Sequence, residues 1–464
     1  MAPIIAVPHG PSTRCRVTTL ARSAVRAEQL LSRWQPATLY RSDARNTRTT
    51  VTATRGRADS TPLVESAYAW RRLAASLALS TIGGVGLWSV VVVLPAVQTE
   101  FEVARGSASL PYTATMLGFA LGGILMGRLA DRFGIVVPLL VSSVSLGVGY
   151  ALAAHAPGLL QFALAQGLVI GALGSSVTFA PLVADVSHWF TRRRGMAVSI
   201  CASGNYLAGT VWPPVLQHFT ATRGWRPTML GVGGFCLLTM LPLTFALRRR
   251  APIAHASAVA PAAVAASSRA PVSPGRLQAL LMVAGLGCCV AMSMPQVHIV
   301  AYAKDLGLGV AHGARMLSLM LGLGVVSRLA SGWIADRIGG VRTLLLGSAL
   351  QCVTLLLFLP VDGLAALYVV SALFGLSQGG IVPSYAIIVR ESFAPREAGT
   401  RIGAVVMATI VGMALGGWMS GAIFDLTGSY QAAFINGIIW NLLNLVVALW
   451  LLGLPRPRRI PAIA

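Results

Sequence analysis

Twelve apolar segments of 19 to 26 residues run through this chain of 464 residues, and each is long enough to cross a lipid bilayer. A helix rises about 1.5 Å per residue and the hydrocarbon core of a bilayer is about 30 Å thick, so about 20 apolar residues suffice. Charged residues make up only 11% of the chain, whereas soluble proteins carry about 25%. The sequence therefore predicts an all-α membrane protein with twelve transmembrane helices, at residues 73–97, 108–128, 136–155, 159–184, 196–218, 226–247, 278–302, 313–333, 342–360, 364–388, 403–424 and 431–453.

A phrase of eight residues occurs twice in the chain. Residues 127–134 read GRLADRFG, and residues 332–339 read GWIADRIG. The copies follow the second and the eighth predicted spans, and internal duplication of this kind is typical of secondary transporters. We therefore expect two six-helix pseudo-repeats, at residues 70–247 and 277–455, joined by a cytoplasmic linker at 248–276.

Two polar tails flank the predicted halves. Residues 1–69 contain ten Arg but only four acidic residues, and they lack an apolar core of signal-peptide length. We predict a disordered tail there; a targeting segment and a start codon placed too far upstream are the alternatives. Residues 456–464 are predicted to form a short cytoplasmic tail.

The basic residues fall almost entirely on one side of the predicted bilayer. With both termini in the cytoplasm, 30 of the 36 basic residues lie in cytoplasmic segments, five lie on the opposite side, and Arg328 lies within a span. Basic loops stay in the cytoplasm, so we expect a multi-pass protein with both termini cytoplasmic. All basic residues except Lys304 are Arg, which indicates a GC-rich genome. We expect the membrane to be the inner membrane of a bacterium. The sequence contains neither a zinc pattern nor a basic recognition helix, so we expect no nucleic-acid partner.

The repeated phrase also carries a candidate gate. Its loop must turn tightly, which favours glycine at its ends, and its aspartate can accept hydrogen bonds from the N-terminus of a neighbouring helix. A latch between the two halves is one interpretation, and an ordinary basic cytoplasmic loop is the other. The predicted gating residues of the two copies are Gly127, Asp131, Arg132, Gly332, Asp336 and Arg337.

The phrase resembles the signature loop of the major facilitator superfamily, and the likeness covers all twelve spans. The resemblance implies that Asp131 meets the cytoplasmic start of the eleventh span near Arg401. It also implies that Asp336 meets the start of the fifth span near Arg193 and Arg194. Both contacts would close the cytoplasmic side and favour an outward-open state.

Further stretches resemble the monocarboxylate transporter and oxalate–formate antiporter group: Gly86 to Ser89, residues 189–197, residues 294–304, and Arg328 with Gly332. The resemblance implies that Arg328 contacts a carboxylate and takes part in proton coupling. Two features depart from the group. Many animal members carry an Asp where this chain has Gly324, and they place a Lys in the first span, where this chain has none.

Polar residues inside the spans supply the candidate substrate site. An arginine inside a membrane is costly, and its usual partner is an anion held by two hydrogen bonds. By spacing alone, Arg328 could equally reach the cytoplasmic face or pair with Asp185 or a backbone carbonyl. His298 could bind a proton or the substrate, or could only join two helices. The other candidates, which bonding between helices would explain equally well, are Asn205, Tyr206, Gln296, Gln378 and Tyr385, with Trp88 as an apolar wall.

These observations favour a secondary active transporter that moves a small organic anion, a mono- or dicarboxylate, by alternating access. Proton symport and anion exchange remain open, so a proton or a counter-anion is a candidate partner besides the bilayer. The alternative is a multidrug or metabolite exporter of the same fold, and a non-transporting receptor or scaffold is less favoured. We expect no cofactor, metal or enzymatic activity, because the sequence contains no nucleotide loop, metal cluster or nucleophile–base set. The resemblance to the superfamily implies a monomer.

Overall fold

The computed structural model describes residues 64–249 and 273–453, and every regular element in these ranges is a helix. The predicted tail at 456–464 lies outside the described residues. So do nearly all of the predicted tail at 1–69 and of the predicted linker at 248–276.

The first six predicted spans form the N-terminal half, in which several spans consist of two or more consecutive helices. The spans are α2 (Ala67–Gly83) with α3 (Val85–Glu100); α4 (Arg105–Ala108) with α5 (Leu110–Phe133); α6 (Val136–Ala154); α7 (Leu159–Leu164) continuing through η1 (Ala165–Gly174) and η2 (Ser175–Thr178) into α8 (Ala180–Ser187); α9 (Arg194–Ala202) with α10 (Gly204–Arg223); and α11 (Trp225–Phe245).

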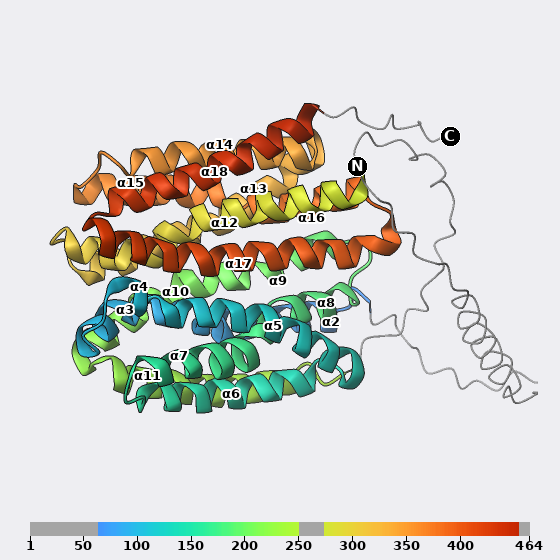
Figure 1. The fold of residues 1–464 in the computed structure, drawn as a ribbon. Helices are drawn as coiled ribbons and strands as arrows, with labels where there is room; N and C mark the ends of the chain where they lie inside the picture. The colour runs from blue at the N-terminus through green and yellow to red at the C-terminus, as the bar shows by residue number, and fades with distance from the viewer. Residues whose placement is uncertain (1–63, 250–272, 454–464) are drawn as a thin grey trace, which may run out of the picture. The chain divides into compact units, whose positions relative to one another are not determined.

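The last six predicted spans form the C-terminal half. They are α12 (Pro274–Asp305), α13 (Val310–Ile338), α14 (Gly340–Leu357), α15 (Leu364–Gln378) with α16 (Ile381–Ser392), α17 (Pro395–Thr427) and α18 (Tyr430–Gly453). Figure 1 shows the two halves side by side, with the described chain entering α2 and leaving α18 at one end of the bundle. We call this the tail end and the opposite end the far end; the sequence predicts that the tail end is cytoplasmic.

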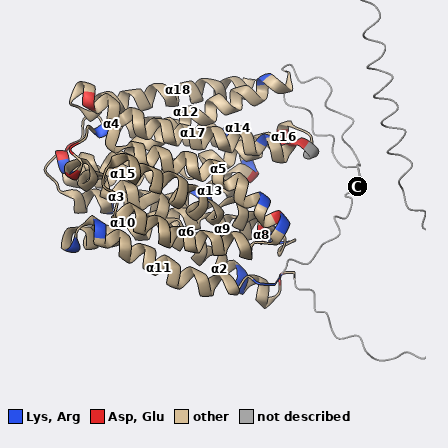
Figure 2. Cartoon of the chain, turned by 60° about the horizontal axis from the view of Figure 1, so that its bottom comes forward, with Lys and Arg blue, Asp and Glu red and all other residues tan. Residues whose placement is uncertain are grey.

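The helices match the predicted spans. Eleven helical stretches of the described chain are long and apolar enough to cross a membrane, and they coincide with eleven of the predicted spans. The fifth span, predicted at 196–218, is also helical, as α9 and α10, but polar residues such as Asn205, Gln217 and His218 make it less apolar. Figure 2 shows charged residues gathered at the two ends of the bundle, with almost none between them. The chain is therefore a multi-pass membrane protein.

The two copies of the repeated phrase end in the same backbone conformation. Gly134 has φ 83° and ψ 167°, and Gly339 has φ 83° and ψ 165°. A positive φ favours glycine because it has no Cβ. The predicted turn is therefore confirmed at the last glycine of each copy. The first glycines, Gly127 and Gly332, were also expected in a loop, but they lie inside α5 and α13, which continue to Phe133 and Ile338.

The two halves meet along α10 and α13, along α17 with α4 and α5, and along α3 and α12. Glycines of α17 allow close approach towards the far end: a Cβ on Gly417 would lie 2.8 Å from the Tyr112 ring, and one on Gly421 would lie 2.9 Å from the α4 backbone. Nearer the tail end, Gly123 and Gly127 of α5 have no such neighbour within 4 Å. The α5 and α17 helices thus touch at the far end and part towards the tail end.

Candidate functional site

Arg328 lies on α13, in the part of the helix nearer the tail end. Its Nη1 donates a hydrogen bond to the carbonyl of Ala202 at 3.0 Å, and its Nε donates to the carbonyl of Gly379 at 3.4 Å. These carbonyls lie where α9 gives way to α10 and where α15 gives way to α16. Two interrupted helices, one from each half, therefore hold the guanidinium through neutral acceptors. Among the residues that the structure describes, no carboxylate forms an ion pair with Arg328.

The ring of Tyr206 faces the same guanidinium. The Arg328 Cζ lies 4.4 Å from the ring centre, a distance that suits a cation–π contact. The ring also fills the space beside Gly324, one turn earlier on α13: a Cβ there would lie 2.6 Å from Tyr206 Cε1. An Asp at position 324 would collide with this ring, so Tyr206 occupies the space that a side chain there would need.

Two of the predicted glutamines meet near this region. Gln296 of α12 donates from Nε2 to Oε1 of Gln378, and both side chains are buried. Nε2 of Gln378 is buried and makes no hydrogen bond within the described chain, and it would lie 3.7 Å from a Cβ on Gly324. An unpaired buried donor costs about 1–3 kcal/mol, so this amide is available to an acceptor.

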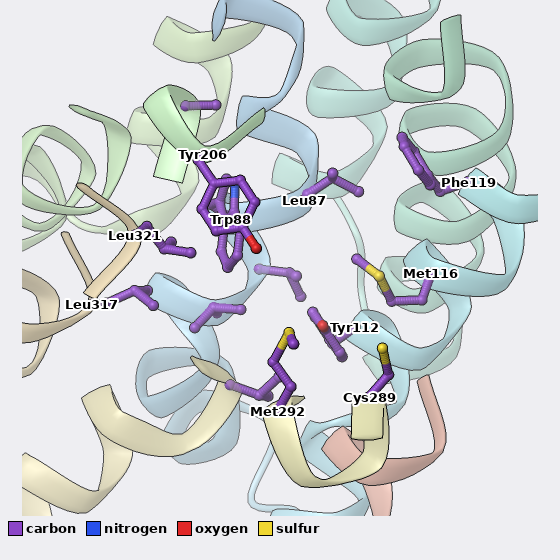
Figure 3. Packing of buried hydrophobic residues seen from close by; sticks show 14 of the residues in the cluster. Leu87, Trp88, Tyr112, Met116, Phe119, Tyr206, Cys289, Met292, Leu317 and Leu321 are labelled. Atoms are coloured by element: carbon purple, nitrogen blue, oxygen red, sulfur yellow. The ribbon is translucent and has the colours of Figure 1, made fainter. Parts of the chain in front are cut away.

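Trp88 and Asn205 join the first and fifth spans. Trp88 Nε1 donates to the backbone carbonyl of Asn205 at 3.2 Å, while the side-chain Oδ1 of Asn205 is buried without a partner among the described residues. Figure 3 shows Trp88 and Tyr206 within a buried apolar cluster. The cluster includes Leu87, Tyr112, Met116, Phe119, Cys289, Met292, Leu317 and Leu321. The predicted apolar wall is thus part of a larger apolar region between the halves.

His298 and Tyr385 do not join this group. His298 lies seven residues from the far end of α12, whereas Arg328 lies eighteen residues from the far end of α13, about 16 Å further along the bundle axis. The His298 ring bonds to α17 and α18, with Nε2 2.8 Å from the Gly417 carbonyl and Nδ1 3.2 Å from the Tyr430 hydroxyl. Tyr385 donates its hydroxyl proton to Oδ1 of Asn444 at 2.7 Å, inside the C-terminal half.

The predicted gating residues form no ion pair with their expected partners. Asp131 and Asp336 are exposed, and neither forms an ion pair with any residue in 64–249 or 273–453. The neighbouring arginines find other partners. Arg132 stacks on Phe133, Arg337 stacks on Trp333, Arg193 stacks on Trp70, Arg194 bonds to Ser187, and Arg401 pairs with Glu397. The two predicted latches are therefore not made in this conformation and stay predictions for the opposite one.

The halves are instead joined at the far end, by residues that are not among the predicted site residues. The backbone N–H groups of Arg105 and Gly106 donate to the two carboxylate oxygens of Asp425 at 2.8 and 2.6 Å. The Arg105 guanidinium donates to both oxygens of Asp305, and to the Tyr430 hydroxyl at 2.8 Å. We call these five residues the far-end latch. A signal was present in the sequence, because Arg105 is one of only five basic residues predicted on the non-cytoplasmic side.

A second ion pair lies at the tail end, within the N-terminal half. The buried Arg72 grips Asp185 with Nε at 2.9 Å and Nη2 at 2.8 Å, and its Nη1 donates to the carbonyls of Leu247 and Arg249. Asp185 thus pairs with Arg72 rather than with Arg328. This contact fastens the start of the first span to the ends of the fourth and the sixth.

Glu65 holds the loop that carries the predicted gating arginines. Its Oε1 accepts hydrogen bonds from the backbone N–H groups of Arg193 at 2.8 Å and Thr191 at 3.2 Å. The bond from Arg193 is the largest cause that lowers the pKa of the Glu65 carboxyl. The loop before α9 is therefore fixed to the residues that precede α2.

The sequence is similar to a protein family and to several named transporters. The sequence profile of the Major Facilitator Superfamily matches residues 76–364 and 316–463. Monocarboxylate transporter 13 of Rattus norvegicus is 28% identical over 341 residues, which cover 72% of this chain and 77% of the rat protein. Monocarboxylate transporter 11 of Homo sapiens is 27% identical over 391 residues, which cover 80% of each chain.

Solved structures show the same fold. A bacterial homolog of the human lysosomal transporter Spinster, in an inward-facing and occupied conformation, matches with a TM-score of 0.65 at 13% sequence identity. The match covers 86% of this chain and 100% of that one.

Proposed function

Since the chain belongs to the Major Facilitator Superfamily of membrane transporters, we propose that it moves a small organic anion, a mono- or dicarboxylate, across the cytoplasmic membrane by alternating access. The single observation that carries the proposal is the setting of Arg328. Its guanidinium touches two backbone carbonyls and an aromatic face, and within the described chain it has no carboxylate partner.

A cation in such a place favours an anionic ligand. A charge that is partly withdrawn from water is costly unless it is paired. A carboxylate can take two parallel hydrogen bonds from a guanidinium, and the unpaired Nε2 of Gln378 supplies a further donor close to Gly324. The substrate carboxylate would supply the negative charge that no described residue supplies to Arg328.

The two ends of the bundle support alternating access. The far-end latch is closed in this structure, while Asp131 and Asp336 at the tail end are exposed and unpaired with any described residue. In the opposite state, these aspartates would meet the starts of the eleventh and fifth spans, and the far-end latch would open. With the tail end in the cytoplasm, the conformation described here is closed to the outside.

The apolar cluster around Trp88 favours a second candidate, an exporter of lipophilic metabolites or drugs. Its buried side chains include Leu87, Met116, Met292 and Leu321 (Figure 3). In a state in which the halves move apart, these side chains would line an apolar cavity, and such a lining binds lipophilic molecules without a counter-charge. Transport by the anion transporter should depend on Arg328, whereas transport by the lipophilic exporter should not.

The test is uptake of radiolabelled small carboxylates into proteoliposomes that contain the purified protein. We expect uptake by the wild type and a loss of at least tenfold in Arg328→Gln. Arg315→Gln is the matched control, since Arg315 is an exposed arginine at the far end of the same helix. Carboxylate uptake that is equal in Arg328→Gln and wild type, or uptake of lipophilic cations alone, contradicts the proposal.

A further inference from the structure

The Tyr430 hydroxyl lies between a cation of one half and a histidine of the other. It is 2.8 Å from Arg105 Nη1 and 3.2 Å from His298 Nδ1. His298 is fully buried, Tyr430 is 3% exposed and Arg105 is 7% exposed, whereas Asp305 and Asp425 reach the surface. The two carboxylates, Arg105 and Tyr430 thus form a continuous polar path from the far-end surface to His298.

The hydrogen-bond donors in this path assign the protonation state of His298. The guanidinium of Arg105 can only donate, so the Tyr430 oxygen accepts from it and directs its own proton to His298 Nδ1. The Gly417 carbonyl can only accept, so His298 Nε2 carries a hydrogen. With the latch closed, the network therefore selects the neutral imidazole with its hydrogen on Nε2.

A second proton on His298 conflicts with the closed latch. Protonated Nδ1 would donate towards the Tyr430 hydroxyl, so the hydroxyl could no longer donate to it. It would also set an imidazolium one hydroxyl away from the Arg105 guanidinium, and like charges in a dry site repel.

The groups around His298 come from both halves. The charged ones are Arg105 on α4, Asp305 on α12 and Asp425 on α17, and the neutral ones are Tyr430 on α18 and the Gly417 carbonyl. Only Arg105 belongs to the N-terminal half. When the far end opens, the cation leaves with its half, and His298 stays beside two carboxylates with access to water.

We propose that His298 is a proton-binding site that competes with Arg105: the far-end latch closes only over a neutral His298, and a proton on His298 favours an open far end. By linkage, the latch expels the proton as it closes, and the proton opens the latch to the same extent. The proton comes from the outer solution and sits on Nδ1. The inference rests on the proposed alternating access, and it makes the opening of the far end depend on the pH of the outer solution.

The experiment measures the far end directly and uses no substrate. Spin labels are attached at Pro157→Cys and Gly363→Cys, on exposed far-end loops of the two halves, after the six native cysteines are replaced. Distance distributions are recorded between about pH 8 and about pH 5, where histidine titrates. We expect the ratio of open to closed far ends to rise as pH falls, by at most about tenfold per pH unit for one proton.

Three variants assign the effect. His298→Gln should lose the pH dependence. His312→Gln should keep it, because His312 also bonds to a tyrosine hydroxyl, that of Tyr368 at 3.1 Å, but lies wholly within the C-terminal half. Tyr430→Phe keeps the ring and removes the hydroxyl that links His298 to Arg105, so it should reduce the pH dependence of the open-to-closed ratio. If His298→Gln fails to fold, Tyr430→Phe tests the inference in its place.

A wild type whose far end ignores pH overturns the inference, and so does a pH response that survives unchanged in His298→Gln or Tyr430→Phe. These outcomes leave the proposed transport of an anion intact. A far end that never opens, even when Asp425→Ala removes half of the latch, contradicts alternating access itself and with it both proposals.

Discussion

The Arg328 guanidinium lies 4.4 Å from the centre of the Tyr206 ring. The ring fills the space beside Gly324, where a carboxylate one turn before the arginine would otherwise fit. An aromatic face stabilises a cation by about 0.5–2 kcal/mol but does not neutralise it. The charge of Arg328 is therefore held in place and not neutralised, which is what the proposed binding of an anion requires.

The contact between Gly324 and Tyr206 makes the smallest substitution at that glycine costly. We expect Gly324→Ala to destabilise the protein by about 1–3 kcal/mol, since the added methyl group forces the Tyr206 ring to move. Gly234→Ala on α11 is the control, because no neighbour lies within 4 Å of a Cβ there. Thermal unfolding in detergent measures both. Equal shifts for the two glycines would show that the close contact with Tyr206 carries no energy.

Removal of Asp185 should leave Arg72 as an unpaired buried cation. The two side chains are 12% and 1% exposed, and loss of one partner from a buried pair costs about 3–5 kcal/mol. Glu397→Ala breaks the exposed pair with Arg401, which is worth about 0.3–0.5 kcal/mol. Thermal unfolding of Asp185→Ala and Glu397→Ala should differ accordingly, and the double variant Arg72→Leu with Asp185→Leu should recover much of the loss. An Asp185→Ala protein as stable as the Glu397→Ala protein would contradict this view of the tail end.

Asp425→Ala should loosen the far end. The carboxylate accepts from the two N–H groups that begin α4, and a capping contact of this type is worth about 0.5–2 kcal/mol. A loss of about 1 kcal/mol raises the ratio of open to closed far ends by about fivefold. The label pair at positions 157 and 363 measures the ratio. Glu102→Ala, at an exposed carboxylate on a far-end loop, should leave it unchanged; an equal effect of both substitutions would remove Asp425 from the latch.

Asp131→Asn should weaken the closure of the tail end instead, so it should slow transport without destabilising the conformation described here. Asp131 is exposed and forms no ion pair with the described residues, so the melting temperature of this conformation should not change. Transport should slow several-fold, because the substitution weakens the latch that closes the tail end in the other state and shifts the population towards the state described here. Uptake in proteoliposomes measures the rate. A wild-type rate would mean that the repeated phrase is only a basic loop.

Much of the fold was predictable because hydropathy and turn chemistry are local. Apolar length placed the spans, and the final glycines of the two repeated phrases, Gly134 and Gly339, have the positive φ that a tight turn needs. The duplication correctly indicated two six-helix halves of the major facilitator fold. The fifth span was predicted from its length, as one of twelve apolar segments, and it is helical in spite of its polar residues, Asn205 among them.

The site was less predictable because its contacts join distant parts of the chain. Arg105 and Asp305 are 200 residues apart. Arg105 is unusual in the sequence as a basic residue on the predicted outer side, but nothing in the sequence identifies Asp305 as its partner. The carbonyls that hold Arg328 belong to Ala202 and Gly379, and no side-chain pattern marks a backbone acceptor. His298 was selected for its chemistry, but only the packing of α17 and α18 against α12 gives its partners.

The most direct test of the account is the thermal stability of the purified protein against a panel of small carboxylates and lipophilic drugs, for wild type and Arg328→Gln. A ligand at about 100 times its dissociation constant stabilises the native state by about 2.7 kcal/mol, which is a readily measured shift. We predict that carboxylates stabilise the wild type and have no effect on Arg328→Gln. Stabilisation of both proteins by drugs alone, with no response to carboxylates, would contradict the assignment of Arg328 as the anion site.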